Sequence, residues 1–165
     1  MERRLIVMRH AQARSGDVDH ERRLTDHGQK DARRIADRLV EVGWIPARVL
    51  CSDAARTVET WSRMVDRIPG PIELLTTSRL YGAAFDAFSA VAGEQPDAIP
   101  SLLAIGHNPG WEEVVAVLSS ERVSLGTANA ALLIARRDAG PRWHDALEPD
   151  SWRLADVLTP KEHHG

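Results

Sequence analysis

The chain has 165 residues, a formal net charge of −3, 43% apolar residues and 27% charged residues. This composition is typical of one soluble globular domain without a membrane span, and the charge makes nucleic acid an unexpected partner. The four apolar residues before Arg9 are too few for a signal-peptide core, and Cys51 as the one cysteine excludes an intrachain disulfide. We therefore expect a cytoplasmic monomer with one domain over residues 1–160 and a mobile tail over residues 161–165.

The first elements expected along the chain are a strand, a loop and a helix. The apolar run Leu5–Met8 predicts a short strand buried on both faces, and the polar segment Ser15–Arg23 predicts a loop. Thr25 is a suitable N-cap for a helix that ends near Gly43. The apolar stripe of that helix is Ala32, Ile35, Ala36, Leu39 and Val40.

A second strand and a second helix are expected next. Arg48–Cys51 predicts the strand, after which Ser52 or Asp53 can cap a helix that ends before Pro69. The expected apolar stripe of this helix is Ala54, Val58, Trp61 and Val65. The run Ile72–Leu75 then predicts a third short strand.

The same alternation continues in the second half of the chain. The spacing of Phe85 and Phe88 predicts a third helix, and Leu102–Ile105 predicts another buried strand. Asn108 is a suitable cap for a fourth helix, with Pro109 at its first position. The apolar stripe of that helix is Trp111, Val114, Val115 and Leu118.

The C-terminal part of the sequence is less regular. Ala130–Ala135 predicts a strand, residues 138–141 predict a turn, and Trp143–Leu147 predicts the returning strand of a hairpin. Trp143 and Trp152 leave two interpretations open, a place in the core and a surface for a partner. Strands that alternate with helices predict an α/β fold, a three-layer sandwich whose mainly parallel central sheet is flanked by helices.

Three segments share one design, in which a buried strand ends in polar residues and a helix follows. They are LIVMRHA, VLCSDAAR and LLAIGHNPG. Because ligands of open α/β sheets bind at the carboxyl ends of the strands, we expect Arg9, His10, Arg56 and His107 to meet at one place. Two guanidinium groups and two helix N-termini at one place favour an anion with several acceptor oxygens, and phosphate is the natural candidate.

Each of these residues also has a simpler interpretation. Arg56 alone is typical of a solvated helix face, and His107 alone is typical of a hydrogen-bonded histidine at a strand end. The functional interpretation is favoured because three strand ends deliver such groups to the same edge of the predicted sheet.

Other phosphate chemistries fit the sequence less well. Cys51 and Arg56 are one residue too close for the C-x5-R loop of cysteine phosphatases, and no glycine lies between them. The segment Asp17-Val18-Asp19 resembles the D-x-D of aspartyl-phosphate phosphatases but does not follow the first strand directly. The chain has no P-loop motif, and its two candidate histidines have no recognised metal spacing, so we expect neither a metal nor another cofactor.

Four segments resemble the motifs of the histidine phosphatase superfamily, whose fold is phosphoglycerate-mutase-like. MRHAQA is similar to the RHG motif, ERRLTDHGQKDA to R-P-L-T-x-x-G, CSDAARTVET to S-P-x-x-R-A-x-E-T, and IGHNPGWEEVV to G-H-N-P-G. The resemblance covers roughly the first two thirds of the chain and is closest to the short branch typified by the SixA phosphohistidine phosphatases. The chain departs from the motifs at Ala11, Arg23 and Asp53, and none of these departures removes a catalytic side chain.

The resemblance implies a hydrolase in which His10 is the nucleophile and forms a phosphohistidine intermediate. Arg9, Arg56 and His107 would bind the phosphoryl group and neutralise the charge that develops on it, and Arg22 would contact the substrate or the phosphate. A neutral imidazole and fixed cations suit phosphoryl transfer without a metal ion.

The substrate implied by the resemblance is a phosphorylated molecule, and phosphohistidine on a protein is favoured. Longer members of the superfamily supply a glutamate as proton donor, whereas the candidates here, Glu73, Asp86 and Glu94, fit no motif. A small-molecule phosphomonoesterase of the same superfamily and a non-catalytic phospho-ligand-binding module are the alternatives. The intact nucleophile counts against the binding module, because binding alone does not need it.

Overall fold

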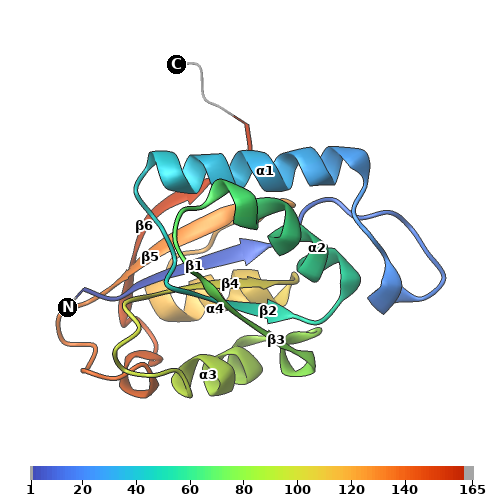
Figure 1. The fold of residues 1–165 in the computed structure, drawn as a ribbon. Coiled ribbons are helices and arrows are strands. Elements are labelled where there is room, and N and C mark those ends of the chain that lie inside the picture. Colours follow the sequence, from blue (N-terminus) through green and yellow to red (C-terminus); the bar gives the residue numbers. More distant parts are fainter. Residues whose placement is uncertain (1, 162–165) are drawn as a thin grey trace.

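The computed structural model describes residues 2–161, which form a six-stranded mixed sheet with helices on both faces (Figure 1). The strands are β1 (Arg4–Arg9), β2 (Arg48–Ser52), β3 (Glu73–Thr77), β4 (Ser101–Gly106), β5 (Ala130–Ala135) and β6 (Trp152–Leu158). Their order in the sheet is β3-β2-β4-β1-β5-β6. The first four strands in this order are parallel to one another, whereas β5 pairs antiparallel with both β1 and β6. The predicted α/β class with a mainly parallel sheet is confirmed.

The helices of the described residues cover the sheet in pairs. They are α1 (Asp26–Glu41), α2 (Ala55–Met64), α3 (Phe85–Gly93) and α4 (Gly110–Ser119). Helices α1 and α2 pack over one face of the sheet, and α3 and α4 pack over the other (Figure 1). A cluster of buried apolar side chains lies beneath each pair, so the sheet is the middle of three layers.

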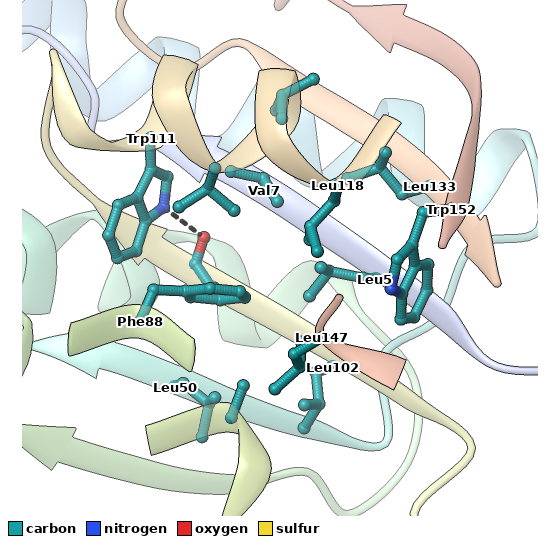
Figure 2. Close-up of a cluster of buried hydrophobic side chains, with 14 of the residues drawn as sticks. Leu5, Val7, Leu50, Phe88, Leu102, Trp111, Leu118, Leu133, Leu147 and Trp152 are labelled. Carbon is teal, nitrogen blue, oxygen red and sulfur yellow. Dashed lines mark hydrogen bonds between the residues drawn. The ribbon is translucent and has the colours of Figure 1, made fainter. Parts of the chain in front are cut away.

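The central strands are buried on both faces, as their continuous apolar runs predict. Leu5 and Val7 of β1 face the cluster under α3 and α4, and Ile6 faces the cluster on the other side. Figure 2 shows the first of these clusters, in which the indole Nε1 of Trp111 donates to Ala104 O at 3.0 Å. This bond satisfies the one polar atom of a fully buried indole and ties α4 to β4.

The start of α1 lies against the segment that follows β1. The predicted cap is confirmed, because Thr25 Oγ1 accepts a hydrogen bond from Gly28 N at 2.9 Å. Thr25 N donates to Gln12 O at 3.0 Å, and a Cβ atom added at Gly28 would lie 2.1 Å from the same oxygen. Only glycine allows this approach, which holds the chain after His10 beside the first turn of the helix.

The buried face of α2 differs from the predicted apolar stripe. Val58 and Val65 of that stripe are exposed, and the buried side chains are instead mostly polar: Arg56, Thr57, Glu59, Thr60, Trp61 and Met64. The predicted cap is also wrong, since Ala54 occupies the cap position and no side chain caps the helix. Ser52 Oγ lies 2.8 Å from His107 Nε2 instead. The spacing of apolar residues could not predict this buried face, because most of its side chains are polar and are buried by hydrogen bonds to other segments.

The N-terminus of α4 also differs from the prediction that Asn108 caps the helix and Pro109 is its first residue. Pro109 precedes the helix rather than beginning it, and the Asn108 side chain donates to Leu125 O at 2.8 Å rather than capping the helix. A Cβ atom at Gly110 would lie 1.8 Å from Ala83 O. The first turn of α4 therefore packs directly against the backbone that leads into α3.

The returning strand of the C-terminal hairpin is β6 rather than the predicted Trp143–Leu147. That segment contains a 3₁₀ helix over His144–Ala146. The sequence pattern does not predict β6. Only the two end residues of this strand are buried, so its alternation of apolar and polar residues is weak. Trp143 and Trp152 are both buried and stack with 5.8 Å between their ring centroids, which places them in the core rather than on a partner surface.

The tail expected over residues 161–165 lies outside the described residues except for Lys161. Within residues 2–161, no helix has both the length and the apolar character that a membrane crossing requires.

Candidate active site

The four residues expected at the strand ends lie together at the carboxyl edge of the parallel strands. Arg9 is the last residue of β1 and is paired in register with Gly106, the last residue of β4. His10 N donates to Gly106 O at 3.1 Å, so the residues after β1 and β4 are neighbours. The ring centroids of His10 and His107 are 5.5 Å apart, and Arg56 enters from the first turn of α2.

His10 is held by its own backbone neighbourhood in one orientation. The imidazole Nδ1 lies 2.7 Å from Ala11 O, and the preceding peptide is held because Ala11 N donates to Thr60 Oγ1 at 3.0 Å. Since a carbonyl oxygen can only accept, this contact assigns the proton to Nδ1 and leaves Nε2 with a free lone pair. Burial lowers the pKa of His10 to about 4, with further lowering by Arg56, Arg9 and Arg22. At neutral pH the imidazole is therefore uncharged.

His107 forms the second wall of the site. Its Nε2 atom lies 2.8 Å from Ser52 Oγ, which anchors the ring to the end of β2. Burial and the nearby Arg56 lower the pKa of His107 to about 3. Its Nδ1 atom is buried and has no hydrogen-bond partner among residues 2–161.

Three arginine side chains supply the positive charge of the site. Arg9 donates to Leu125 O at 3.2 Å, and the buried Arg56 donates from both terminal nitrogens to Asp19, at 2.8 Å to the backbone O and 3.1 Å to Oδ2. Arg22 donates to Asp19 Oδ1 at 2.9 Å. The structure therefore brings Arg22, the fifth residue expected in the site, to the same cluster as Arg56.

Asp19 and Tyr81 complete the site, and neither is assigned a role by the sequence patterns. The hydroxyl of Tyr81 donates to Asp19 Oδ2, and its ring meets the His107 ring edge-on with 5.6 Å between centroids. Hydrogen bonds from Tyr81, Arg22 and Arg56 hold the pKa of Asp19 far below its usual range. The spacing of Asp19 and Arg22, three residues apart, is the one sequence signal for this contact; Tyr81 has none.

The three carboxylic acids considered as proton donors are not bonded to this cluster. Glu73 begins β3 and pairs with Arg48, at the opposite end of the strands from the site. Glu94 follows α3 and pairs with Arg79. Asp86 is exposed in the first turn of α3 and makes no described hydrogen bond to the histidines or arginines of the site. The described contacts thus place none of these three acids beside His10.

Cys51, the alternative nucleophile considered from the sequence, lies in surroundings that keep its thiol protonated. Cys51 is fully buried within β2, and burial raises the pKa of its thiol to about 12. A protonated, enclosed thiol cannot act as a cysteine nucleophile at neutral pH. Within residues 2–161, no three histidine, cysteine, aspartate or glutamate side chains are grouped as metal ligands.

An open groove of about 390 Å³ lies beside the site. It runs between the 3₁₀ helix Asp19–Glu21 and α2, and its lining includes His20, Ala55, Val58 and Ser62. His20 also contacts the Tyr81 ring edge-on, with 4.9 Å between centroids. Through this contact, His20 lies between the groove and Tyr81 of the site.

The protonation state of His10 can be measured directly. In ¹⁵N-labelled protein, we expect the His10 ring to show a protonated Nδ1 and an unprotonated Nε2 at pH 7, and to gain its second proton only near pH 4, because burial and the arginines disfavour the cation. The spectrum of His10→Gln would identify the signal. A ring that titrates near 6.5, the ordinary histidine value, would contradict this assignment.

Comparison with known proteins agrees with this geometry. Residues 5–99 match the family model described as the histidine phosphatase superfamily (branch 1). An uncharacterized chloroplastic protein of Arabidopsis thaliana is 34% identical, in an alignment that covers 96% of this chain and 78% of the relative.

Two similar solved structures cover nearly the whole chain. A protein provisionally named phosphohistidine phosphatase SixA, from Nakamurella multipartitia, is 26% identical with a TM-score of 0.81 and 97% of each chain covered. A protein of the same provisional name from Agrobacterium tumefaciens is 26% identical with a TM-score of 0.80, covering 96% of this chain and 98% of its own.

Proposed function

This chain belongs to the histidine phosphatase superfamily (branch 1), and we propose that it hydrolyses phosphohistidine on a protein through a covalent phosphohistidine at His10. The observation that carries the proposal is the contact of His10 Nδ1 with Ala11 O at 2.7 Å. It leaves Nε2 as the nucleophilic atom of a neutral ring that is surrounded by fixed cations.

In the first step, His10 Nε2 attacks phosphorus and the leaving group departs on the opposite side. Arg9, Arg56 and His107 bind the equatorial oxygens and stabilise the spread charge of a loose transition state. Arg22 extends the same positive field. In the second step, water attacks the phosphorus, the P–N bond breaks, and its electron pair returns to Nε2. These roles need no metal ion, and we propose a metal-independent reaction.

The missing acid favours phosphohistidine as the substrate. An alkoxide leaving group needs a proton donor, which typically contributes about 10²–10⁴-fold to the rate. An imidazole leaves more easily because its pKa is about 6.5. Since Glu73 and Glu94 pair elsewhere, a P–N bond suits this site better than an alkyl ester.

The open groove supports a substrate carried on a protein. Its lining residue His20 contacts the ring of Tyr81, and the exposed side chain of Val58 lies in it, so residues that flank a phosphohistidine have a surface to contact. The names of the two similar solved structures agree with this substrate class.

The substrate class is tested by comparing kcat/KM for three kinds of substrate. We expect phosphohistidine protein to be hydrolysed fastest, aryl phosphates next, and unactivated alkyl phosphates at least about 100-fold more slowly than phosphohistidine, because only the alkyl esters need an acid. A chelator should leave all three rates unchanged. Preference for one small alkyl phosphate would overturn the proposal and assign the substrate to the phosphomonoesterase class, with Asp86 as the acid to examine.

A further inference from the structure

The carboxylate of Asp19 lies within the arginine cluster that is proposed to bind phosphate. Its Oδ1 accepts from Arg22 at 2.9 Å, and its Oδ2 accepts from Arg56 at 3.1 Å and from the Tyr81 hydroxyl. Its backbone oxygen accepts from Arg56 at 2.8 Å. These four contacts fix the residue, although 53% of its side chain remains exposed at the mouth of the site.

A negative charge at this place needs an explanation. It lowers the positive potential that attracts a phosphate, so it opposes the binding that the arginines provide. It is also no proton donor at neutral pH, because its three hydrogen-bond donors keep it ionised. A carboxylate that neither attracts phosphate nor donates a proton is best explained by a cationic group on the substrate.

The hydrogen bonds of Asp19 leave room for one more donor. An ionised carboxylate has about four acceptor positions. Arg56 and Tyr81 use two on Oδ2, and Arg22 uses one on Oδ1, so Oδ1 keeps one that is not used by the described residues. The rings of Tyr81 and His20 contact each other next to this carboxylate. They provide an aromatic surface against which a flat ligand ring can pack.

We propose that Asp19 accepts a hydrogen bond from the N–H of the substrate's own phosphoimidazole ring, at the ring nitrogen that does not carry phosphorus. This inference rests on the proposed function. A phosphoimidazole loses its phosphoryl group readily when that second nitrogen is protonated, because the ring then leaves as neutral imidazole rather than as an anion. Asp19 favours the protonated ring and so takes the place of a general acid without giving up a proton.

The step balances without any proton transfer. His10 Nε2 uses its lone pair to form the new P–N bond, and the electron pair of the old P–N bond stays on the departing ring nitrogen. The His10 proton remains on Nδ1 against Ala11 O, and the proton of the leaving ring remains on its second nitrogen against Asp19. Phosphorus moves between two imidazole rings, each of which has a hydrogen-bond acceptor for its N–H.

The test compares N-phosphoimidazole with 4-nitrophenyl phosphate in Asp19→Asn. We expect kcat/KM for N-phosphoimidazole to fall about 100-fold further than kcat/KM for the aryl phosphate, because the aryl phosphate loses only the hydrogen bonds by which Asp19 holds Arg56 and Arg22. The alkaline limb of kcat for N-phosphoimidazole should also move to lower pH, because the bound ring loses the partner that keeps it protonated. Asp17→Asn removes the same charge from the same loop and should change neither substrate.

Equal losses for the two substrates would show that Asp19 only positions Arg56, and would overturn the inference. Unchanged hydrolysis of N-phosphoimidazole in Asp19→Asn would also overturn it. If the wild-type protein hydrolyses the aryl phosphate but not N-phosphoimidazole, the proposed function fails, and the role of Asp19 fails with it. The wild-type measurement therefore separates the two failures.

Discussion

His10→Ala is expected to abolish turnover and covalent labelling together. The wild-type protein, mixed rapidly with ³²P-labelled substrate, should give a phosphoenzyme that survives base and decays in acid, as a P–N bond does. In the variant no nitrogen lies at the position of Nε2, so neither the intermediate nor the product can form at a measurable rate. Quenched-flow labelling and a steady-state assay measure the two effects on the same preparation.

The control for this variant is His27→Ala. His27 is an exposed histidine of α1 that pairs with Asp31 and makes no described hydrogen bond to the residues of the site, so its removal should leave both labelling and turnover intact. Circular dichroism checks that His10→Ala is folded. Label that persists in folded His10→Ala would assign the nucleophile to another residue and would contradict the mechanism.

The positions of His10 and His107 could be predicted because each directly follows a buried apolar run. A short apolar run such as Leu5–Met8 is typical of a strand in the middle of the sheet, and the next residue then lies at the strand's carboxyl end. The local sequence thus determines where these two rings lie. Arg56 follows from the same argument, because α2 begins three residues after β2.

The contacts that orient these groups could not be predicted, because they come from distant segments. Tyr81 reaches Asp19 across 62 residues, and Thr60 holds the Ala11 peptide across 49. The spacing of apolar residues also does not predict the buried face of α2. Arg56 and Thr60 are buried there because they form hydrogen bonds with Asp19 and Ala11. Polar residues whose partners lie elsewhere in the chain carry no pattern in the sequence.

Contacts with distant segments also explain why the prediction of a strand at Trp143–Leu147 is wrong. The strand β6 lies at an edge of the sheet and exposes much of its surface, so tertiary pairing with β5 rather than its own pattern determines its structure. Trp143 and Trp152 are buried because their rings stack on each other beneath the hairpin, a contact between segments that the sequence separates.

Replacement of Arg56 is expected to give the second large loss of activity. The guanidinium is buried, and hydrogen bonds from both terminal nitrogens to Asp19 fix its position. Arg56→Ala should raise the activation free energy by about 3 kcal/mol, the typical cost of losing one preorganised donor to a developing charge. The loss should appear equally in kcat and kcat/KM, since the arginine acts mainly on the transition state.

Arg56→Lys distinguishes a planar fork from a simple positive charge. A lysine keeps the charge but cannot donate two parallel hydrogen bonds to phosphoryl oxygens, so we expect it to recover only part of the lost rate. Arg63→Ala is the matched control, because Arg63 lies on the same helix and pairs with Glu59 rather than with a residue of the arginine cluster. Full activity in Arg56→Lys would mean that charge alone suffices. A rise in KM with unchanged kcat in Arg56→Ala would mean that Arg56 binds the substrate and its transition state equally, and would remove it from the catalytic step.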